Sequence, residues 1–233
     1  MGFNEKVHAY IAAKYYVYLK ESFKSRGIEA FKFATRYYAE QRGRRMALRA
    51  IADGEPLTYE TYRKYGEWVN TEEIKDLGQS NQSESISVSP DYEIHVTRCP
   101  WAAQFKEMNL PEAGVAYCSN LDPSIARGFS PEIKYSTTQT LHNHDYCIQR
   151  VENSGLTEGG RPLKKEDGLK SFTYHCAHSY WSYREIAIGI FGEEGKTVAE
   201  KVLDDLAKDY GKDAKEKLLK YEKVNFNINS PEL

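Results

Sequence analysis

The sequence has no apolar stretch long enough to span a membrane and no strong excess of either charge sign. Its 233 residues carry 32 Lys and Arg against 34 Asp and Glu, a formal net charge of -2, so no whole-chain basic surface is available to nucleic acid. The first residues lack the basic segment and apolar core of a secretory signal, and Lys6 stands where a myristoylation motif needs Ser or Thr. We expect a cytoplasmic protein without nucleic-acid or membrane partners; a homo-oligomer is left open.

The common catalytic and cofactor motifs are also missing. We find no GxGxxG, Walker A, HExxH or GxSxG pattern, so the sequence does not indicate a dinucleotide-binding protein, a P-loop enzyme, a zinc protease or an α/β-hydrolase. Four cysteines are too few for a disulfide scaffold in a chain of this length, and we expect them to be free thiols, metal ligands or nucleophiles. The 18 tyrosines are abundant, and most are expected to lie half-buried on helices.

Hydrophobic spacing predicts helices at both ends of the chain and strands in the middle. Helices are expected over 3–24, 28–52, 59–69, 101–108, 174–191 and 197–221. Strands are expected over 92–98, 114–117, 133–138 and 145–151, with loops or turns at 78–90, 119–131 and 157–168. This order predicts an α+β fold with a central antiparallel sheet. We expect one domain over residues 1–233: a helical part (1–75), the sheet with the candidate site (83–152) and a second helical part (171–222).

Reactive side chains are concentrated between residues 99 and 147. This segment holds three of the four thiols and two of the six histidines. Its reactive side chains are Cys99, Cys118, Asp122, Arg127, His142, His144, Asp145 and Cys147. Cys and His side chains together can form a nucleophile–base pair or a metal site.

The same segment resembles the L-2-amino-thiazoline-4-carboxylic acid hydrolase family. The resemblance rests on Cys99-Pro100, on Cys118 with Asp122 four residues later, on the turn 128–131 (GFSP) and on the strand 144–149 (HDYCIQ). The flanking segments 43–45 (GRR) and 191–195 (FGEEG) also match, so the resemblance covers about residues 28 to 215. Three positions depart from the family pattern: His144 replaces Gly, Gln149 replaces an aromatic residue, and Ser130 replaces Asn.

The resemblance implies a hydrolase that opens a small cyclic amidine or isothiourea carboxylate at the ring carbon between sulfur and nitrogen. Such a reaction needs a nucleophile, a base, a proton donor to the leaving atom and a cation for the carboxylate. Cys118, at the end of an expected strand, is the nucleophile candidate; the alternative is a small buried apolar residue. The version with activated water uses Asp122 and His144 as bases, although Asp122-Pro123 is also compatible with a simple Asx-turn.

Side-chain alternation would place His142 and His144 on one face of a strand and Cys147 on the other. The two histidines would then act as base and proton donor, and Asp145 would orient one of them. Arg127 is the first candidate for the substrate carboxylate. Arg45 shares a helix face with Arg49, and this face either binds an anion or is solvated. The remaining binding candidates are Cys99, Cys147 and His175, the last from a small His and Cys cluster in a C-terminal helix.

Two other readings remain open. Cys99, Cys118, Cys147 and a His could form a zinc shell, although they lack the usual short Cys spacing; otherwise no cofactor is expected. A related pocket could also serve a non-catalytic sensor of small molecules. Turnover of the ring substrate separates an enzyme from a sensor.

Overall fold

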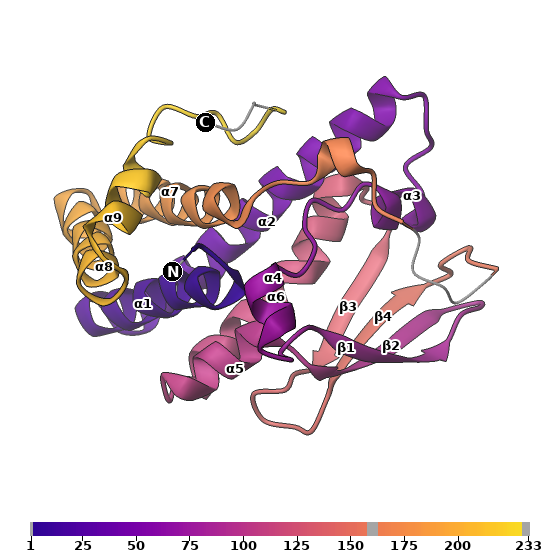
Figure 1. The fold of residues 1–233 in the computed structure, drawn as a ribbon, viewed down its shortest axis with the longest axis horizontal. Helices are drawn as coiled ribbons and strands as arrows, with labels where there is room; N and C mark the ends of the chain where they lie inside the picture. Colours follow the sequence, from indigo (N-terminus) through magenta and orange to yellow (C-terminus); the bar gives the residue numbers. More distant parts are fainter. Residues whose placement is uncertain (1, 158–162, 230–233) are drawn as a thin grey trace.

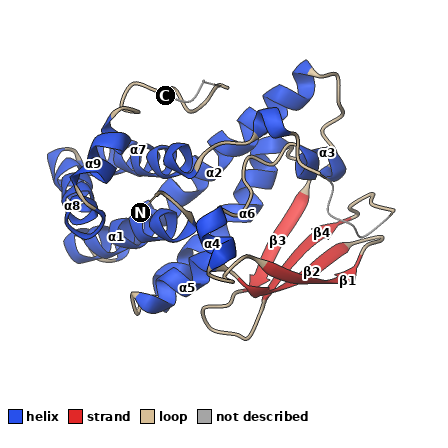
Figure 2. Ribbon diagram, in the orientation of Figure 1, coloured by secondary structure: helices blue, strands red, loops and turns tan. Residues whose placement is uncertain are grey.

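The computed structural model describes residues 2–157 and 163–229. In these ranges nine α-helices and a four-stranded sheet follow each other in the predicted order, with helices at both ends and the sheet in the middle (Figure 1). The predicted α+β class is therefore confirmed. The sheet lies on one flank of the molecule and the helices gather on the other side of it (Figure 2). Among the described helices, none is both long and apolar enough to cross a membrane.

The N-terminal helices α1 (Glu5–Phe23) and α2 (Ser25–Ala52) agree with the predicted segments. Helix α1 begins at Asn4, whose side chain accepts hydrogen bonds from the N–H groups of Lys6 and Val7. It is buried on several sides because it packs against α2, α7 and α8. Tyrosines suit this position, since their rings fill the core while their hydroxyls find polar partners: Tyr10 donates to Asp209 and Tyr15 to the carbonyl of Tyr180.

The C-terminal helices are α7 (Phe172–Phe191), α8 (Glu193–Tyr210) and α9 (Lys212–Leu219). The corner between α7 and α8 is at Gly192, whose φ of 59° favours glycine. The rings of Phe23 and Phe191 stack with centroids 3.6 Å apart, which joins the corner of α1 and α2 to that of α7 and α8. The helical frame is thus two helix pairs that pack on each other.

The antiparallel sheet has the order β1-β2-β4-β3 and consists of β1 (Gln82–Ser87), β2 (Tyr92–Arg98), β3 (Lys134–Gln139) and β4 (Cys147–Glu152). In its register Val96 lies opposite Cys147, and Gln149 lies between Ile94 and Thr137. Side chains at every second position share a face, so Cys147 and Gln149 point to the same side of the sheet. This side is the one that α6 covers.

Helix α6 (Pro111–Phe129) is the largest departure from the predicted elements. The predicted strand at 114–117 is wrong, and the predicted turn-rich segment at 119–131 is wrong up to residue 129: these residues lie in the helix, which begins at Pro111 and continues through Pro123. Gly, Ser, Asn and Pro are typical of turns, but here packing between α2 and β3 stabilises the helix (Figure 1).

Smaller departures concern polar or short segments. The predicted loop at 78–90 contains β1, an edge strand of Ser, Gln and Glu that has little need for apolar side chains because it is mostly exposed. Helix α3 (Tyr59–Lys64) ends before the predicted Val69, and a short α4 (Glu72–Asp76) follows. Helix α5 (Pro100–Glu107) agrees with prediction, whereas the predicted loop at 157–168 lies partly outside the described residues and ends in a 3-10 turn at Glu166–Gly168.

Helices α2 and α6 cross with their backbones in direct contact. A Cβ atom at Gly43 would lie 2.1 Å from the carbonyl oxygen of Ile125, and one at Gly128 would lie 2.5 Å from the carbonyl oxygen of Glu40. No larger residue fits at either position without separating the helices. The crossing therefore fixes how the residues of α6 lie relative to those of α2.

We expect Gly43→Ala to destabilise the fold by about 2 kcal/mol or more, because its methyl group overlaps the backbone of α6. The matched control is Gly189→Ala in α7, where a Cβ has no neighbour within 4 Å; helix propensity alone should there stabilise by about 0.5–1 kcal/mol. Thermal and urea unfolding measure both. Equal stabilities of the two variants would contradict the tight crossing.

Candidate active site

A thiol and an imidazole meet where α6 faces the sheet. Cys118 lies in the middle of α6, and His142 lies in the turn between β3 and β4. The Sγ atom of Cys118 is 3.2 Å from Nε2 of His142. The predicted nucleophile candidate and one predicted base thus lie within hydrogen-bond distance, although they come from a helix and a turn rather than from two strands.

The position of His142 depends on small features of its surroundings. Its ring lies against the backbone of Gly114, one helical turn before Cys118; a Cβ atom there would be 2.2 Å from Cε1 of the imidazole. The edge of Phe105 packs on the same ring. The turn is held from the sheet side, because the N–H of Leu141 donates to the sulfur of Cys147 at 3.1 Å. Cys147 therefore positions the turn that carries the imidazole.

Asp122 joins this pair one helical turn after Cys118, on the same face of α6. The amide of Gln149 on β4 donates to its carboxylate at 3.0 Å. Burial raises the pKa of Asp122 to about 6, against a smaller opposite effect of the Arg42 charge. Near neutral pH this carboxyl group can therefore exist in both forms, as an acid–base catalyst requires. The Asx-turn explanation for Asp122 is wrong, since the residue lies inside a helix.

The thiols of Cys99 and Cys147 lie near that of Cys118. Burial raises the pKa of Cys118 well above its usual value, and the nearby thiols of Cys99 and Cys147 and the carboxyl of Asp122 add to the effect. Burial also raises the pKa of Cys99 to about 12. Yet Cys99, Cys118 and Asp122 all retain some accessible surface. We call this partly exposed group of side chains, together with His142, the recess.

His142 is neutral in this recess at pH 7. Burial lowers the pKa of its imidazole to about 4. Burial therefore favours an uncharged thiol beside an uncharged imidazole, in place of a preformed thiolate–imidazolium pair. A neutral Nε2 that faces the thiol can accept its proton, which makes His142 a suitable base for Cys118.

The expected pairing of His142 with His144 is wrong. Strand β4 begins only at Cys147, so both histidines lie in the preceding turn and strand alternation does not apply to them. His144 and Asp145 are exposed there, whereas His142 is half-buried against Gly114. The structure thus brings one histidine of the expected pair to Cys118.

Arg127 lies away from the recess. It is nine residues after Cys118 in α6, about half a turn around the helix axis, and it pairs with Glu40 of α2 at the surface. The expected grouping of Arg127 with Cys118 is therefore corrected.

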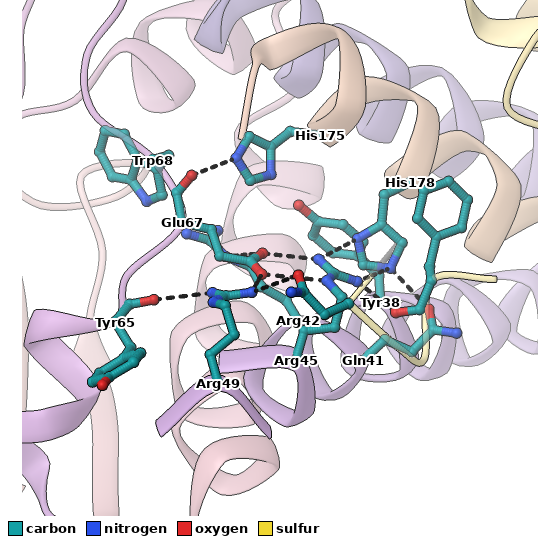
Figure 3. Close-up of polar contacts among 12 residues, drawn as sticks. Tyr38, Gln41, Arg42, Arg45, Arg49, Tyr65, Glu67, Trp68, His175 and His178 are labelled. Atoms are coloured by element: carbon teal, nitrogen blue, oxygen red, sulfur yellow. Dashed lines mark hydrogen bonds and ion pairs between the residues drawn. The ribbon is translucent and has the colours of Figure 1, made fainter. Parts of the chain in front are cut away.

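A second group of polar side chains lies in the core between α2 and α7 (Figure 3). Arg45 is fully buried and binds the carboxylate of Glu67 with Nε and Nη2, at 3.3 and 2.8 Å. Arg49 donates to the same carboxylate at 3.0 Å. Burial alone would raise the pKa of Glu67, but the charge and hydrogen bonds of Arg45, together with Arg42 and Arg49, lower it to about 2.

The third nitrogen of Arg45 is also occupied, because Nη1 donates to the carbonyl of Phe226 at 2.6 Å. In addition, Nη2 lies 3.3 Å from Nδ1 of His178. His175, another predicted binding residue, donates from Nε2 to the backbone carbonyl of Glu67 at 3.1 Å. The structure therefore places Arg45 and His175 in this buried cluster, where Arg45 stabilises the fold and has no nitrogen left for a ligand. The solvated-face alternative for Arg45 is wrong as well.

Sequence reasoning missed Glu67, Gln149 and Gly114. Gln149 was visible as a departure from the family pattern, and it is the departure that reaches the site, through Asp122. The other two do not: Ser130 ends α6 in a buried position, and His144 is exposed. Glu67 has no recognisable motif around it, because its partners lie 18 and 22 residues earlier in the chain.

The zinc shell considered as an alternative needs Cys99, Cys118, Cys147 and a histidine around one point. Within residues 2–157 and 163–229, no three His, Cys, Asp or Glu side chains are grouped so that they could hold a metal ion. Cys99, Cys118 and Cys147 are neighbours, but they do not converge on one point with a histidine.

Comparison with known proteins adds one finding. The model of the family described as L-2-amino-thiazoline-4-carboxylic acid hydrolase matches residues 4–148, more than half of the chain. The match includes Cys118, Asp122, His142 and Cys147. No curated protein and no solved structure matches the chain.

We expect Glu67→Gln to destabilise the fold by about 3–5 kcal/mol, because it leaves the buried Arg45 without its counter-charge. The pKa of Glu67 in the fold, about 2, lies below the ordinary 4.5, so its ionised form stabilises the protein above about pH 4.5. This contribution is lost as the pH falls from 4.5 towards 2, and the difference between wild type and variant should shrink there. Urea unfolding at several pH values measures it.

The control is Glu29→Gln, which removes an exposed ion pair with Lys32 and should leave the stability almost unchanged. A similarly small effect of Glu67→Gln would contradict the role given to the buried cluster.

Proposed function

The chain belongs to the L-2-amino-thiazoline-4-carboxylic acid hydrolase family, and on this premise we propose that it opens a small cyclic isothiourea or amidine carboxylate by hydrolysis, with Cys118 as the nucleophile. The observation that carries the proposal is the 3.2 Å contact between Sγ of Cys118 and Nε2 of His142, with Asp122 one helical turn away. These three groups cover the nucleophile, the base and the proton donor that the reaction needs.

The first step forms a bond between Sγ and the ring carbon that lies between sulfur and nitrogen. The proton of the thiol passes to Nε2 of His142 as this bond forms, so a free thiolate need not exist beforehand. The ring C–S or C–N bond then breaks, and the leaving atom takes a proton from Asp122. The opened substrate stays bonded to Sγ of Cys118 through the same carbon, as an isothiourea if the C–S bond breaks or an imidodithiocarbonate if the C–N bond breaks, while His142 is protonated and Asp122 ionised.

Water completes the cycle by adding to the same carbon. One of its protons passes to Asp122 and the other to the amidine nitrogen of the adduct. The bond from carbon to Sγ breaks, and Cys118 recovers its proton from His142. One water is consumed, the ring-opened carbamoyl product leaves, and all three side chains return to their starting forms.

A raised pKa suits Asp122 to this role. A carboxyl group with a pKa of about 6 is protonated for much of the time in weak acid, whereas an ordinary Asp is not. The alternative mechanism, in which Asp122 acts as a base on water, requires the ionised form. The two mechanisms therefore predict opposite effects of pH.

We expect Cys118→Ala to lower kcat/KM for 2-amino-thiazoline-4-carboxylate by at least about 100-fold without loss of the fold, because it removes the attacking atom. The matched control is Cys176→Ala, a buried thiol of α7 outside the site, which should keep the activity. Near-wild-type turnover in Cys118→Ala would leave the activated-water mechanism. Saturable binding without any turnover by the wild type would instead support a sensor.

The pH profile of kcat/KM should rise through about pH 4, where His142 becomes neutral, and fall through about pH 6, where Asp122 loses its proton. Asp122→Asn should abolish the alkaline limb. An activity that rises through pH 6 would identify Asp122 as a base and contradict its role as the proton donor.

We expect Gly114→Ala to lower kcat/KM by about 100-fold, because the added methyl group occupies the place of the His142 ring and displaces it from Cys118. Helix propensity favours Ala, so melting temperatures should show that the fold persists. Gly189→Ala, which adds the same methyl group where nothing is near, serves as the control. Unchanged activity in Gly114→Ala would show that the position of His142 does not matter.

A further inference from the structure

The core between α2, α6 and α7 holds more positive than negative charge. Three arginines of one face of α2, Arg42, Arg45 and Arg49, surround the single carboxylate of Glu67 (Figure 3). Three nearby histidines are uncharged at neutral pH, because burial lowers their pKa values; they are His8, His175 and His178. They neither add to the positive charge nor balance it. A buried excess of positive charge is unfavourable unless an anion is bound beside it.

Arg42 is the arginine whose charge is not satisfied. The oxygens of Glu67 already accept hydrogen bonds from Arg45 and Arg49, and Nε of Arg42 lies 3.7 Å from the nearer oxygen, beyond hydrogen-bond distance. This Nε is buried without a hydrogen-bond partner. Among the described residues, no acceptor bonds the terminal nitrogens Nη1 and Nη2 either, and these two atoms are not fully buried although the residue is only 7% exposed. They are therefore free to bind a ligand.

The guanidinium of Arg42 lies on the Asp122 side of the cluster. Arg42 precedes Gly43, at which α2 touches α6 beside Ile125, and Asp122 is one helical turn before Ile125. The charge of Arg42 acts on Asp122, one helical turn after Cys118, and on Tyr62. The helix crossing thus brings the guanidinium of Arg42 close to Asp122.

Asp122 does not itself neutralise Arg42. A carboxylate in direct contact with a guanidinium has a lowered pKa, whereas that of Asp122 is raised because burial outweighs the attraction of Arg42. The carboxyl of Asp122 is instead held by the Gln149 amide. Among the described residues, no carboxylate is hydrogen-bonded to Nη1 or Nη2 of Arg42, so these two atoms can take an anion supplied by a ligand.

We propose that Arg42 binds the carboxylate of the substrate and restricts the site to rings that carry one anionic group. The inference rests on the proposed function, and it replaces Arg127 and Arg45 in the role of carboxylate anchor. A guanidinium fits this role because Nη1 and Nη2 match the two oxygens of a carboxylate. Binding through the carboxylate also holds the ring at the recess, so that the carbon between sulfur and nitrogen can reach Sγ of Cys118.

The experiment compares two ligands and three proteins. Calorimetry measures the binding of 2-amino-thiazoline-4-carboxylate and of its neutral 4-carboxamide to wild type, Arg42→Met and Arg44→Met. Arg44 is the matched control, an exposed arginine of the same helix paired with Glu40. Wild type and Arg44→Met should bind the acid about 10- to 100-fold more tightly than the amide, and Arg42→Met should bind both equally weakly. In turnover, Arg42→Met should raise KM more than it lowers kcat.

Melting temperatures separate a binding role from a structural one. Because Arg42 adds an unsatisfied charge, Arg42→Met should be at least as stable as wild type. An Arg42→Met protein that keeps the wild-type preference for the acid overturns the proposal. If Arg42→Met does not fold, the binding of the two ligands to wild type still tests the proposal. Equal affinity of wild type for the acid and the amide overturns it.

The outcome of the hydrolase proposal is read separately. The wild type could prefer the acid through Arg42 and yet turn over neither ligand. This result would contradict the hydrolase proposal and support Arg42 as an anion-binding residue. Turnover with an unchanged KM in Arg42→Met would support the hydrolase proposal and contradict the role of Arg42 as carboxylate anchor.

Discussion

The backbone contact between α2 and α6 is the constraint on which the site depends. Two glycines let the helices touch at Gly43 and Gly128, and every functional side chain of the two helices takes its position from that contact. On α6 it directs Cys118 and Asp122 towards the sheet. On α2 it places Arg42 close to Asp122, while Arg45, one turn further, is buried against Glu67 in the core. The sheet then supplies the partners, Gln149 to Asp122 and the preceding turn to Cys118.

Burial sets the chemistry of the recess. The same desolvation raises the pKa of the Cys118 thiol and of the Asp122 carboxyl and lowers that of the His142 imidazole, so between about pH 4 and pH 6 all three groups are uncharged before a ligand binds. Uncharged groups in contact can exchange a proton as bonds form and break, without a costly separation of charge beforehand. The buried Arg45–Glu67 pair follows the opposite rule: there both charges persist because each satisfies the other.

The sequence allowed the elements with strong periodicity to be predicted, and missed those that tertiary packing decides. Helices α1, α2 and α7 and strand β2 have clear patterns and lie where expected. Helix α6 reads as strand and turn because its Gly, Ser, Asn and Pro favour turns, and only its contacts with α2 and β3 explain why it is helical. Strand β1 is polar because it lies at an exposed edge.

For the site, the reactive residue types were predictable and their partners were not. Cys118, Asp122 and His142 stand out in the sequence, and the family resemblance points to the same segment. Their arrangement depends on α6 being a helix, which puts Cys118 and Asp122 on one face and Arg127 on the other. Glu67 and Arg42 carry no local signal, because the imbalance of three arginines around one carboxylate appears only in the folded chain.

The most direct test of the central claim is to follow Cys118 during turnover. The protein is mixed with 2-amino-thiazoline-4-carboxylate, quenched in acid at short times, and the peptide that carries Cys118 is examined by mass spectrometry. The account predicts a transient adduct with the mass of the opened ring on this cysteine, absent in Cys118→Ala. Rapid turnover with an unmodified Cys118 at every time point, or an adduct on another residue, would contradict it.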